Sequence, residues 1–332
     1  MSKKRIAING FGRIGRLTFR NLVKDPNVEV VAINDLTDNK TLAHLLKFDT
    51  AHGRFDGDVS HSDTHLTVNG NAILATAIKN PAECPWGDLK VDVVLECTGI
   101  FTDREKLSLH IKAGAKKVIL SAPAKGKDVK TIVLGVNQDE ITAEETIYSN
   151  ASCTTNCLAP VVKVLDQNYK IVQGSMSTIH AYTQDQRLQD SPHSDLRRAR
   201  AAAQNIVPTS TGAAKAVSLV YPPVGDKISA IAMRVPTITG SLVDLTVLVE
   251  HAPENADAVN AKVKEAANSD VMKGILKYST DPLVSSDVIG DKHSSVFDSE
   301  LTIVRGNMVR IVTWYDNEAG YSARLAQLAT KV

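Results

Sequence analysis

The chain has 332 residues, which is enough for two domains of ordinary size. Hydrophobic residues make up 43% and charged residues 23%, values typical of a globular protein, and a net charge of +1 gives no indication of nucleic-acid or anionic-lipid binding. The N-terminus lacks the apolar core of a signal peptide, and no apolar run is long enough for a membrane span. Four cysteines do not make a disulfide framework in a chain of this length, so we expect a cytoplasmic protein.

In the first 150 residues, short apolar runs alternate with stretches of helical spacing. The runs are rich in Val and Ile and apolar on both faces, as the strands of a covered parallel sheet are. We expect strands at 5–9, 28–34, 91–97, 118–121 and 131–134, with helices at 16–24 and 105–113 among them. This alternation predicts an α/β fold with a Rossmann-type doubly wound parallel sheet.

A glycine-rich turn follows the first predicted strand and opens a helix. Its glycines are Gly10, Gly12 and Gly15, in the spacing G-x-G-x-x-G. Glycines there permit a tight turn and close approach of the backbone to a pyrophosphate, which the helix N-terminus attracts. A second predicted strand ends at Asp35, whose carboxylate suits the ribose hydroxyls of NAD and repels a 2′-phosphate. The order strand, turn, helix, strand and acid predicts an NAD site; the alternative is an ordinary glycine turn with a surface carboxylate.

After residue 150 the pattern changes to longer strand-like runs. We expect strands at 170–179, 228–233, 241–250 and 308–315, with a helix at 255–268. The sequence therefore predicts two domains. Residues 1–150 form the NAD-binding domain, residues 151–315 form an α+β catalytic domain, and residues 316–332, with a helix at 321–330, return to the first.

Cys153 is the candidate nucleophile. It lies in the polar segment 152–156, directly before an apolar run of helical spacing, and unpaired amide groups at a helix start favour thiolate. The alternative is an inert buried cysteine, which is the commoner state of this residue. Cys157 lies one helical turn further on and is interpreted as packing, and Cys84 and Cys97 are interpreted as structural.

Polar groups in the second half supply the other candidates. His180 ends a strand-like run and begins a polar loop, where it could act as a base. The basic segment 195–200, the hydroxyl-rich segment 208–215 before a helix, and Arg234 could bind an anion such as phosphate; a lone arginine at a strand end can equally be a surface charge. His61 and His65 lack further ligands, so no metal site is predicted.

The sequence resembles the glyceraldehyde-3-phosphate dehydrogenases over essentially its whole length. The motifs that carry the resemblance are residues 8–16, 151–160, 196–203, 208–215 and 314–318, in the order of that family. The resemblance implies a glycolytic enzyme that uses NAD and inorganic phosphate to convert glyceraldehyde 3-phosphate into 1,3-bisphosphoglycerate. It also implies a homotetramer, in which the loop at 183–200 reaches toward a neighbouring subunit's cofactor.

The resemblance also implies a role for each site residue. Cys153 is the nucleophile, and His180 is the base that also polarises the substrate. The implied dinucleotide contacts beside the glycine turn are Arg13, Ile14, Asp35, Lys79, Ser121 and Asn317. Thr183 and Arg234 hold the substrate phosphate, and the site for inorganic phosphate is formed by Ser152, Thr154, Arg198, Thr211 and Gly212. Lys79 stands where arginine is common in the family, and Ser191 stands where NAD-specific members often carry leucine.

Three alternatives differ from this interpretation in chemistry. An erythrose-4-phosphate dehydrogenase shares the thioester but releases an acid by hydrolysis. A non-catalytic nucleotide-binding or RNA-binding protein on the same fold would not need both Cys153 and His180. A dehydrogenase of 2-hydroxy acids would leave the cysteine motif unexplained.

Overall fold

A computed structural model describes residues 3–332. The described chain divides into two compact units. The first unit contains the described residues up to 132, residues 139–151 and residues 322–332. The second unit contains residues 133–138 and 152–321. None of the helices in residues 3–332 combines the length and apolar character needed to cross a bilayer.

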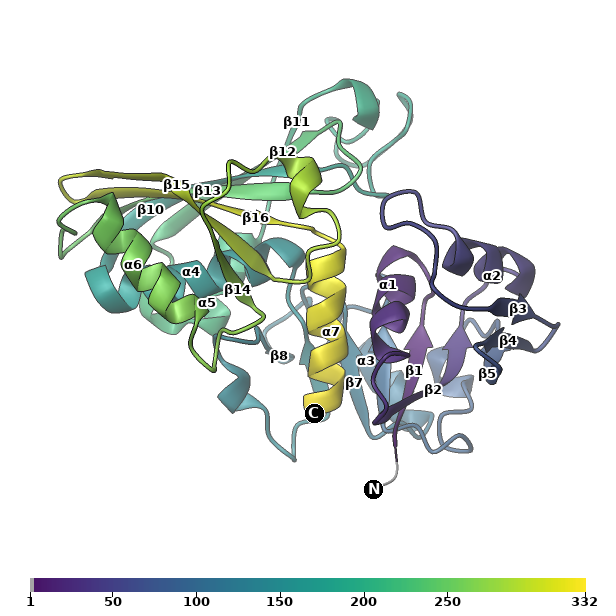
Figure 1. The fold of residues 1–332 in the computed structure, drawn as a ribbon. Coiled ribbons are helices and arrows are strands. Elements are labelled where there is room, and N and C mark those ends of the chain that lie inside the picture. Colours follow the sequence, from purple (N-terminus) through teal and green to yellow (C-terminus); the bar gives the residue numbers. More distant parts are fainter. Residues whose placement is uncertain (1–2) are drawn as a thin grey trace. The chain divides into compact units, whose positions relative to one another are not determined.

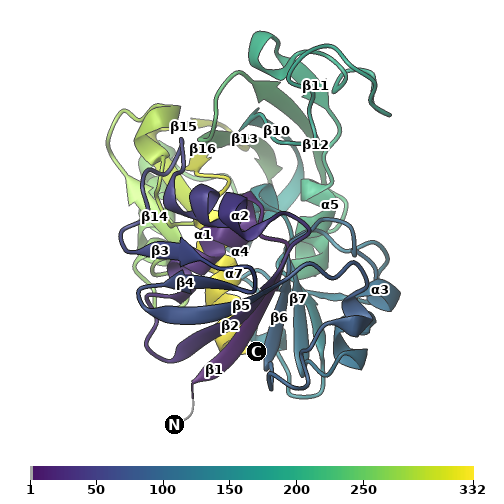
Figure 2. The ribbon, with the colours of Figure 1, turned by 90° about the vertical axis from the view of Figure 1, so that its right-hand side faces the viewer.

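The first unit is built on one sheet with the strand order β3-β4-β5-β2-β1-β6-β7-β9-β8. Neighbours from β5 to β8 run parallel, whereas β3, β4 and β5 form antiparallel pairs at one edge (Figure 2). The strands are β1 Lys4–Asn9, β2 Val28–Asn34, β3 Val59–His61, β4 His65–Val68, β5 Asn71–Thr76, β6 Val93–Glu96, β7 Lys117–Leu120, β8 Lys130–Thr131 and β9 Ile147–Ser149. The helices are α1 Arg13–Leu22, α2 Asn39–Lys47 and α3 Arg104–Lys112, with short 3₁₀ turns at Pro81–Glu83 and Gln138–Glu140. The predicted parallel sheet is thus confirmed.

One strand of the first unit was predicted too long. The run at 131–134 pairs as a strand only through Thr131, after which the chain turns. Ile132, Val133 and Leu134 are buried all the same. Burial in a turn and burial in a central strand require the same apolar run, so the pattern could not separate them. The strand predicted at 91–97 is also shorter, since β6 spans only Val93–Glu96. Strands β3 to β5 and β9 were not predicted, because they are short and, in β3 to β5, partly polar.

The core of the first unit packs the sheet against α3. Val94 of β6 and Val118 of β7 lie in one cluster with Leu107 of α3 and with Trp86, and all four are fully buried. Burying each of these apolar side chains stabilises the fold by about 1.5–3 kcal/mol. The carboxyl ends of the parallel strands are thereby held at one edge of the sheet, where an α/β fold binds its ligand.

The second unit has a mixed sheet with the order β11-β12-β10-β13-β16-β15-β14. Its strands are β10 Ile171–Ala181, β11 Val207–Thr209, β12 Ile228–Val235, β13 Ser241–Val249, β14 Leu276–Ser279, β15 Ser295–Arg305 and β16 Met308–Tyr315. Its helices are α4 Cys153–Tyr169, α5 Ala213–Val220 and α6 Ala256–Ala267, with 3₁₀ turns at Ala202–Gln204, Pro222–Val224 and Ser285–Val288. The three helices cover one face of this sheet (Figure 1). The predicted α+β character is confirmed.

Strand β13 shows how the sequence specifies this layer. Its residues alternate strictly between buried and half-buried. That period of two places every second apolar side chain under the helices. Helix α7, Ala319–Lys331, ends the chain. In the first unit, the Lys4 ammonium donates to the carbonyls of Thr330, at 3.0 Å, and Val332, at 2.5 Å.

Candidate active site

The thiol of Cys153 lies at the first residue of α4. Ser152 caps this helix, because its Oγ accepts a hydrogen bond from the Thr155 amide at 3.1 Å. The cap leaves the N–H groups of Cys153 and Thr154 directed at the thiol. Helix α4 therefore presents the cysteine sulfur beside unpaired backbone donors.

His180 faces this thiol from the end of strand β10. The distance from Cys153 Sγ to His180 Nε2 is 3.5 Å. In the parallel register between β10 and β12, His180 lies opposite Arg234. Cys153 and His180, 27 positions apart in the sequence, thus meet because the start of α4 lies beside the end of β10. The neighbouring strand β12 places Arg234 beside His180.

The other ring nitrogen of His180 fixes the tautomer. Nδ1 lies 2.6 Å from the carbonyl oxygen of Ala181, which can only accept, and 3.0 Å from Arg234 Nη1, which can only donate; the shorter contact assigns the proton to Nδ1. Nε2 is then an unprotonated acceptor facing the sulfur. Arg234 Nη1 donates to the same Ala181 carbonyl at 3.1 Å and lies 3.0 Å from Nδ1. The ring is therefore oriented as a base toward Cys153.

Electrostatics keep both members of this pair neutral. Burial, followed by the positive charge of Arg234, lowers the pKa of His180 to about 3. Burial also raises the pKa of Cys153, against the opposing effects of Arg234 and the helix amides. The helix amides act to lower the pKa of Cys153, as its place at a helix start predicts, but desolvation outweighs them. A neutral imidazole beside a protonated thiol can still accept its proton, since that transfer leaves the net charge unchanged.

Tyr315 was not predicted as a site residue, although it lies in the motif at 314–318. Its hydroxyl is within 2.9 Å of both Thr154 Oγ1 and Thr178 Oγ1, and its ring packs edge-on against His180 at 5.9 Å between centroids. The side chain is buried, and burial raises the pKa of its hydroxyl well above the usual value. Tyr315 therefore links the first turn of α4 to strand β10 by hydrogen bonds, and this link keeps Cys153 and His180 close to each other.

Anion-binding side chains continue from His180 along the following loop. Arg234 Nη1 donates to Thr183 Oγ1 at 3.0 Å, and the Thr183 hydroxyl donates to Asp185. Asp185 in turn accepts from Arg198 Nη1 at 2.6 Å, and Arg198 Nε donates to Thr209 Oγ1 at 2.8 Å. The structure thus joins three of the predicted phosphate residues into one chain of contacts with His180.

Asp185 was not predicted as a site residue, and Thr209 was predicted only as part of the hydroxyl-rich segment 208–215. Burial acts to raise the pKa of Asp185, but the Thr183 hydrogen bond and the charges of Arg234 and Arg198 lower it overall. A carboxylate two residues after Thr183, in a loop rich in arginine, was the available signal. In this structure the Asp185 carboxylate provides the negative charge that balances the Arg198 and Arg234 guanidinium groups.

Two predicted phosphate residues stand apart from this chain of contacts. Within residues 3–332, no hydrogen bond links Thr211 or Gly212 to Cys153, His180 or Arg198. Thr211 Oγ1 accepts from the Ala213 amide at 3.2 Å, and Gly212 is the N-cap of α5 without a side-chain cap. They lie at a helix start that could donate amides to an anion.

The glycine turn of the first unit has the features that a dinucleotide requires. Gly10 has φ +92°, and a Cβ on Gly15 would lie 2.2 Å from the carbonyl oxygen of Gly10. Gly12 is the N-cap of α1, faces open space, and makes no side-chain cap. Asp35 Oδ2 accepts from the Phe11 amide at 2.7 Å, which places the carboxylate beside the turn. The helix start and the absence of a Cβ at Gly12 leave room for a pyrophosphate, so these residues fit NAD.

The remaining first-unit candidates lie around the same sheet edge. Arg13 and Ile14 are in the first turn of α1, and the Arg13 guanidinium pairs with Asp49 at 2.7 Å. Ser121 follows β7, and its amide donates to the Glu96 carbonyl at 2.9 Å. Lys79 is an exposed residue after β5. Each is thus near the end of a parallel strand or at the start of the helix that follows β1.

Asn317 belongs to the second unit and is buried. Its Oδ1 accepts from Thr239 Oγ1 at 3.2 Å and from Ser241 Oγ at 3.0 Å. With the oxygen satisfied in this way, Nδ2 is the group that can donate to a ligand such as a carboxamide.

The other cysteines have structural surroundings. Burial raises the pKa of Cys84, Cys97 and Cys157 to about 12, so their thiols stay protonated at neutral pH. Cys157 lies in the core within 3.9 Å of the hydroxyls of Ser295 and Thr313. These surroundings agree with the interpretation of all three as structural residues.

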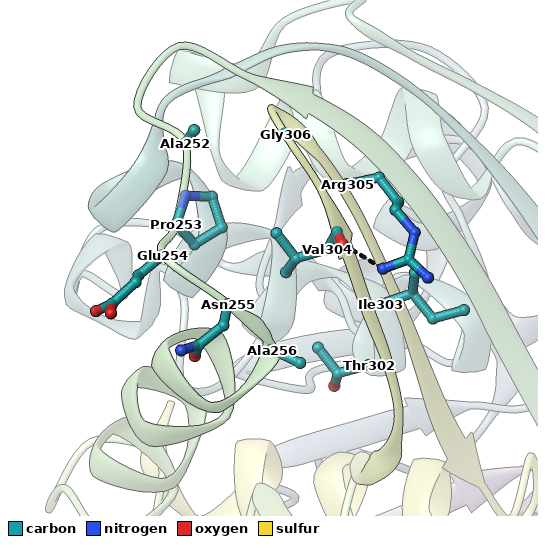
Figure 3. Close-up of a pocket in the computed structure, with 10 residues that line it drawn as sticks. All are labelled: Ala252, Pro253, Glu254, Asn255, Ala256, Thr302, Ile303, Val304, Arg305 and Gly306. Atoms are coloured by element: carbon teal, nitrogen blue, oxygen red, sulfur yellow. Dashed lines mark hydrogen bonds between the residues drawn. The ribbon is translucent and has the colours of Figure 1, made fainter.

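A pocket of the second unit lies away from the predicted site residues. It has a volume of about 430 Å³ and lies between the start of α6 and the end of β15, lined by residues 252–256 and 302–306 (Figure 3). The Arg305 guanidinium, the cation of this pocket, donates to the adjacent Val304 carbonyl at 3.0 Å. None of the predicted site residues lines it. Across residues 3–332, no group of three or more His, Cys, Asp or Glu side chains could hold a metal ion.

Comparison with known proteins identifies the family. Residues 4–104 match the profile described as glyceraldehyde 3-phosphate dehydrogenase, NAD binding domain, and residues 152–317 match the C-terminal domain of the same enzyme. The chain is 55% identical to the glyceraldehyde-3-phosphate dehydrogenase of Streptomyces coelicolor over 331 residues and 54% identical to that of Geobacillus stearothermophilus over 330 residues. It is 57% identical to the Mycobacterium tuberculosis enzyme over 335 aligned positions. Each alignment covers 99% of this chain and 98% of the relative, and the chain therefore belongs to the NAD-dependent glyceraldehyde-3-phosphate dehydrogenase family.

Proposed function

We propose that this protein oxidises and phosphorylates glyceraldehyde 3-phosphate to 1,3-bisphosphoglycerate in glycolysis, through a thioester on Cys153. The observation that carries the proposal is the distance of 3.5 Å between Cys153 Sγ and His180 Nε2, with Nδ1 committed to the Ala181 carbonyl. This is the arrangement of a nucleophile and an oriented base. The names and high identity of the relatives supply the substrate.

The first step is nucleophilic addition. His180 Nε2 accepts the thiol proton, and the sulfur of Cys153 attacks the aldehyde carbon. The carbonyl oxygen becomes negatively charged, and the Cys153 amide and the protonated His180 are the donors available to it. Transfer of the proton from His180 to this oxygen gives the thiohemiacetal.

Oxidation and phosphorolysis complete the cycle. When bound, NAD supplies the acceptor for the hydride that the thiohemiacetal carbon loses. His180 takes the hydroxyl proton in the same step, which leaves a thioester on Cys153. Inorganic phosphate then attacks the acyl carbon, the carbon–sulfur bond breaks, and the acyl phosphate leaves the Cys153 thiolate behind.

Binding roles are proposed for the surrounding groups. Thr183 and Arg234, which already contact each other, would hold the substrate phosphate. The site for inorganic phosphate would be formed by Ser152, Thr154, Arg198, Thr211 and Gly212. The dinucleotide would be held by the turn of Gly10, Gly12 and Gly15 with Arg13 and Ile14, by Asp35 at the adenosine ribose, and by Lys79, Ser121 and Asn317.

The domain roles and the assembly are also proposals. Residues 1–150 with 316–332 would act as the NAD-binding domain and residues 151–315 as the catalytic domain, in a cytoplasmic homotetramer. Large apolar side chains on the loops between β10 and β11 support self-association: Leu188, Leu196 and Ile206 are 81%, 82% and 68% exposed.

The test follows NADH formation from glyceraldehyde 3-phosphate and NAD, with and without inorganic phosphate. Sustained turnover only with phosphate is the expected result. Sustained turnover without phosphate would instead indicate hydrolysis of the thioester, as in an erythrose-4-phosphate dehydrogenase. No NADH under either condition would indicate a binding protein on the same fold.

A further inference from the structure

A buried carboxylate lies beneath the glycine turn of the first unit. Glu96 is the last residue of β6, and its side chain is fully buried. Its Oε2 accepts from Asn9 Nδ2 at 2.6 Å and from His110 Nε2 at 3.0 Å. Its Oε1 accepts from the amide and the hydroxyl of Thr98 at 2.8 and 2.5 Å. Four hydrogen bonds therefore converge on one carboxyl group inside the sheet.

All four partners are donors. The indole nitrogen of Trp86 donates to His110 Nδ1 at 3.0 Å, so Nδ1 is unprotonated and Nε2 carries the hydrogen that points at Glu96. The Thr98 hydroxyl accepts from the Ile100 amide at 3.1 Å, which leaves its hydrogen for Glu96. Only an ionised carboxylate can accept from four donors at once, so the site is built for the negative form.

The carboxylate connects three strand ends. Asn9, which directly precedes Gly10, receives a hydrogen bond on Oδ1 from Asn34 Nδ2 at 2.7 Å, and Asn34 directly precedes Asp35. On the other side, the segment held by Glu96 packs on the turn, because a Cβ on Gly10 would lie 2.7 Å from the Thr98 nitrogen. Glu96 thus fixes, through side chains, the ends of β1, β2 and β6 from which the dinucleotide-binding residues begin.

A buried charge costs desolvation free energy and is therefore a poor means of stabilising a fold. Taking a carboxylate out of water costs several kcal/mol, and apolar replacements of buried ionic groups are often more stable. Stability alone therefore gives no reason for a charge here, whereas a fixed geometry of the three turns does.

We propose that Glu96 is a positioning residue for NAD, whose negative charge holds the turns at Gly10, Asp35 and Thr98 in the arrangement that binds the dinucleotide. Glu96→Gln tests the charge with almost no change in shape. The new amide group replaces one of the two oxygens, so it faces either Asn9 Nδ2 and His110 Nε2–H or the amide and hydroxyl of Thr98. Asn9 and His110 cannot become acceptors, since Asn34 and Trp86 occupy the alternatives, and the Thr98 amide can only donate. The inference rests on NAD binding by the first unit and is independent of the thioester chemistry.

The experiment measures NAD dissociation constants of the full-length protein by calorimetry, together with kcat, KM for NAD and thermal midpoints. Glu96→Gln should weaken NAD binding by about tenfold or more, with kcat at saturating NAD within about twofold of wild type. Thr98→Val, which removes one of the four donors and keeps the shape, should weaken binding by a few-fold. If Glu96→Gln does not fold, the NAD affinity of Thr98→Val tests the inference instead.

The matched control is Val118→Ala, in the core of the same sheet, whose side chain takes no part in the hydrogen bonds of Glu96. It should lower the thermal midpoint and leave NAD affinity unchanged. Wild-type NAD affinity in both polar variants would overturn the inference, as would equal loss of affinity in Val118→Ala. Wild-type protein that binds NAD without turning over would contradict the proposed function and leave this inference intact.

Discussion

In the proposed function, the glycine turn of the first unit and the thiol site of the second would bind their reactants with different parts of the chain. The turn uses backbone amides and absent side chains, and its glycines lie within six consecutive residues, 10–15. The thiol site uses side chains from a helix start, two strand ends and a loop. A backbone site depends on local conformation, whereas a side-chain site depends on strand register. Substitutions should therefore damage the two sites in different ways.

The largest expected effect is from Cys153→Ser. A serine hydroxyl is a far weaker nucleophile than a thiol, and neutral His180 cannot generate the alkoxide, so turnover should fall by about 10³-fold or more. NAD affinity should be unchanged, because Cys153 is not among the residues proposed to hold the dinucleotide. Steady-state kinetics measure turnover, and calorimetry measures NAD affinity. Turnover near the wild-type level would contradict the role of Cys153 as nucleophile.

His180→Asn should produce the next largest loss. Without the acceptor at 3.5 Å from Sγ, the thiol keeps its proton, and kcat should fall by about 10²–10⁴-fold. Alkylation of Cys153 by iodoacetamide at neutral pH should slow in parallel. Unchanged alkylation would show that His180 does not activate the thiol.

Paired glycine substitutions sharpen the description of the backbone site. Gly15→Ala places a Cβ 2.2 Å from the Gly10 carbonyl oxygen, so both the thermal midpoint and NAD affinity should fall. Gly12→Ala faces open space at φ −71°, so the thermal midpoint should be unchanged while NAD affinity drops by about tenfold. Equal loss of stability in both variants would contradict the interpretation that the missing side chain at Gly12 is needed for NAD binding and not for folding.

Acid titration gives a smaller effect, specific to the side-chain site. The folded-state pKa of His180 is about 3, against 6.5 for an ordinary histidine. Between these values the unfolded chain binds a proton that the folded chain does not, so stability is complete above pH 6.5 and is lost as the pH falls. At pH 5 the loss is about 2 kcal/mol. Urea unfolding of wild type and His180→Asn at pH 7 and 5 should show a smaller pH dependence in the variant by that amount; identical dependence would argue against a neutral buried ring.

Cys157→Ala should have the smallest effect. The thiol is buried and makes only weak contacts with two hydroxyls, so its loss should cost about 1 kcal/mol of unfolding free energy and leave turnover intact. Chemical denaturation and steady-state kinetics test this. A large loss of activity would mean that the second cysteine takes part in the chemistry.

The same contrast explains what the sequence could predict. The glycine turn and Asp35 could be predicted from spacing, because the turn occupies six consecutive residues and the acid follows the next strand, although their contact joins the ends of β1 and β2. Cys153 and His180 were candidates by residue type, but their contact depends on the pairing of β10 beside α4, which no local pattern encodes. The resemblance to a family, and not spacing, supplied the roles of the phosphate residues.

The misses have physical causes too. Glu96 and Tyr315 lie in apolar strands, where a polar residue among Val and Leu gives no sign of how many partners it finds. Asp185 acts through charges contributed by Arg198 and Arg234, which reach it only in the folded chain. The effect of the helix amides on Cys153 could be predicted from the sequence, whereas the desolvation that outweighs it is a property of the packed site.

The most direct test of the account is to trap the acyl group on Cys153. Wild-type protein is mixed with glyceraldehyde 3-phosphate and NAD in the absence of phosphate, quenched in acid, digested and mapped by mass spectrometry. The account predicts one acyl adduct per chain, on the peptide that contains Cys153, and its disappearance when phosphate is added before the quench. NADH formation with no adduct on Cys153, or with the adduct on another residue, would contradict the thioester mechanism.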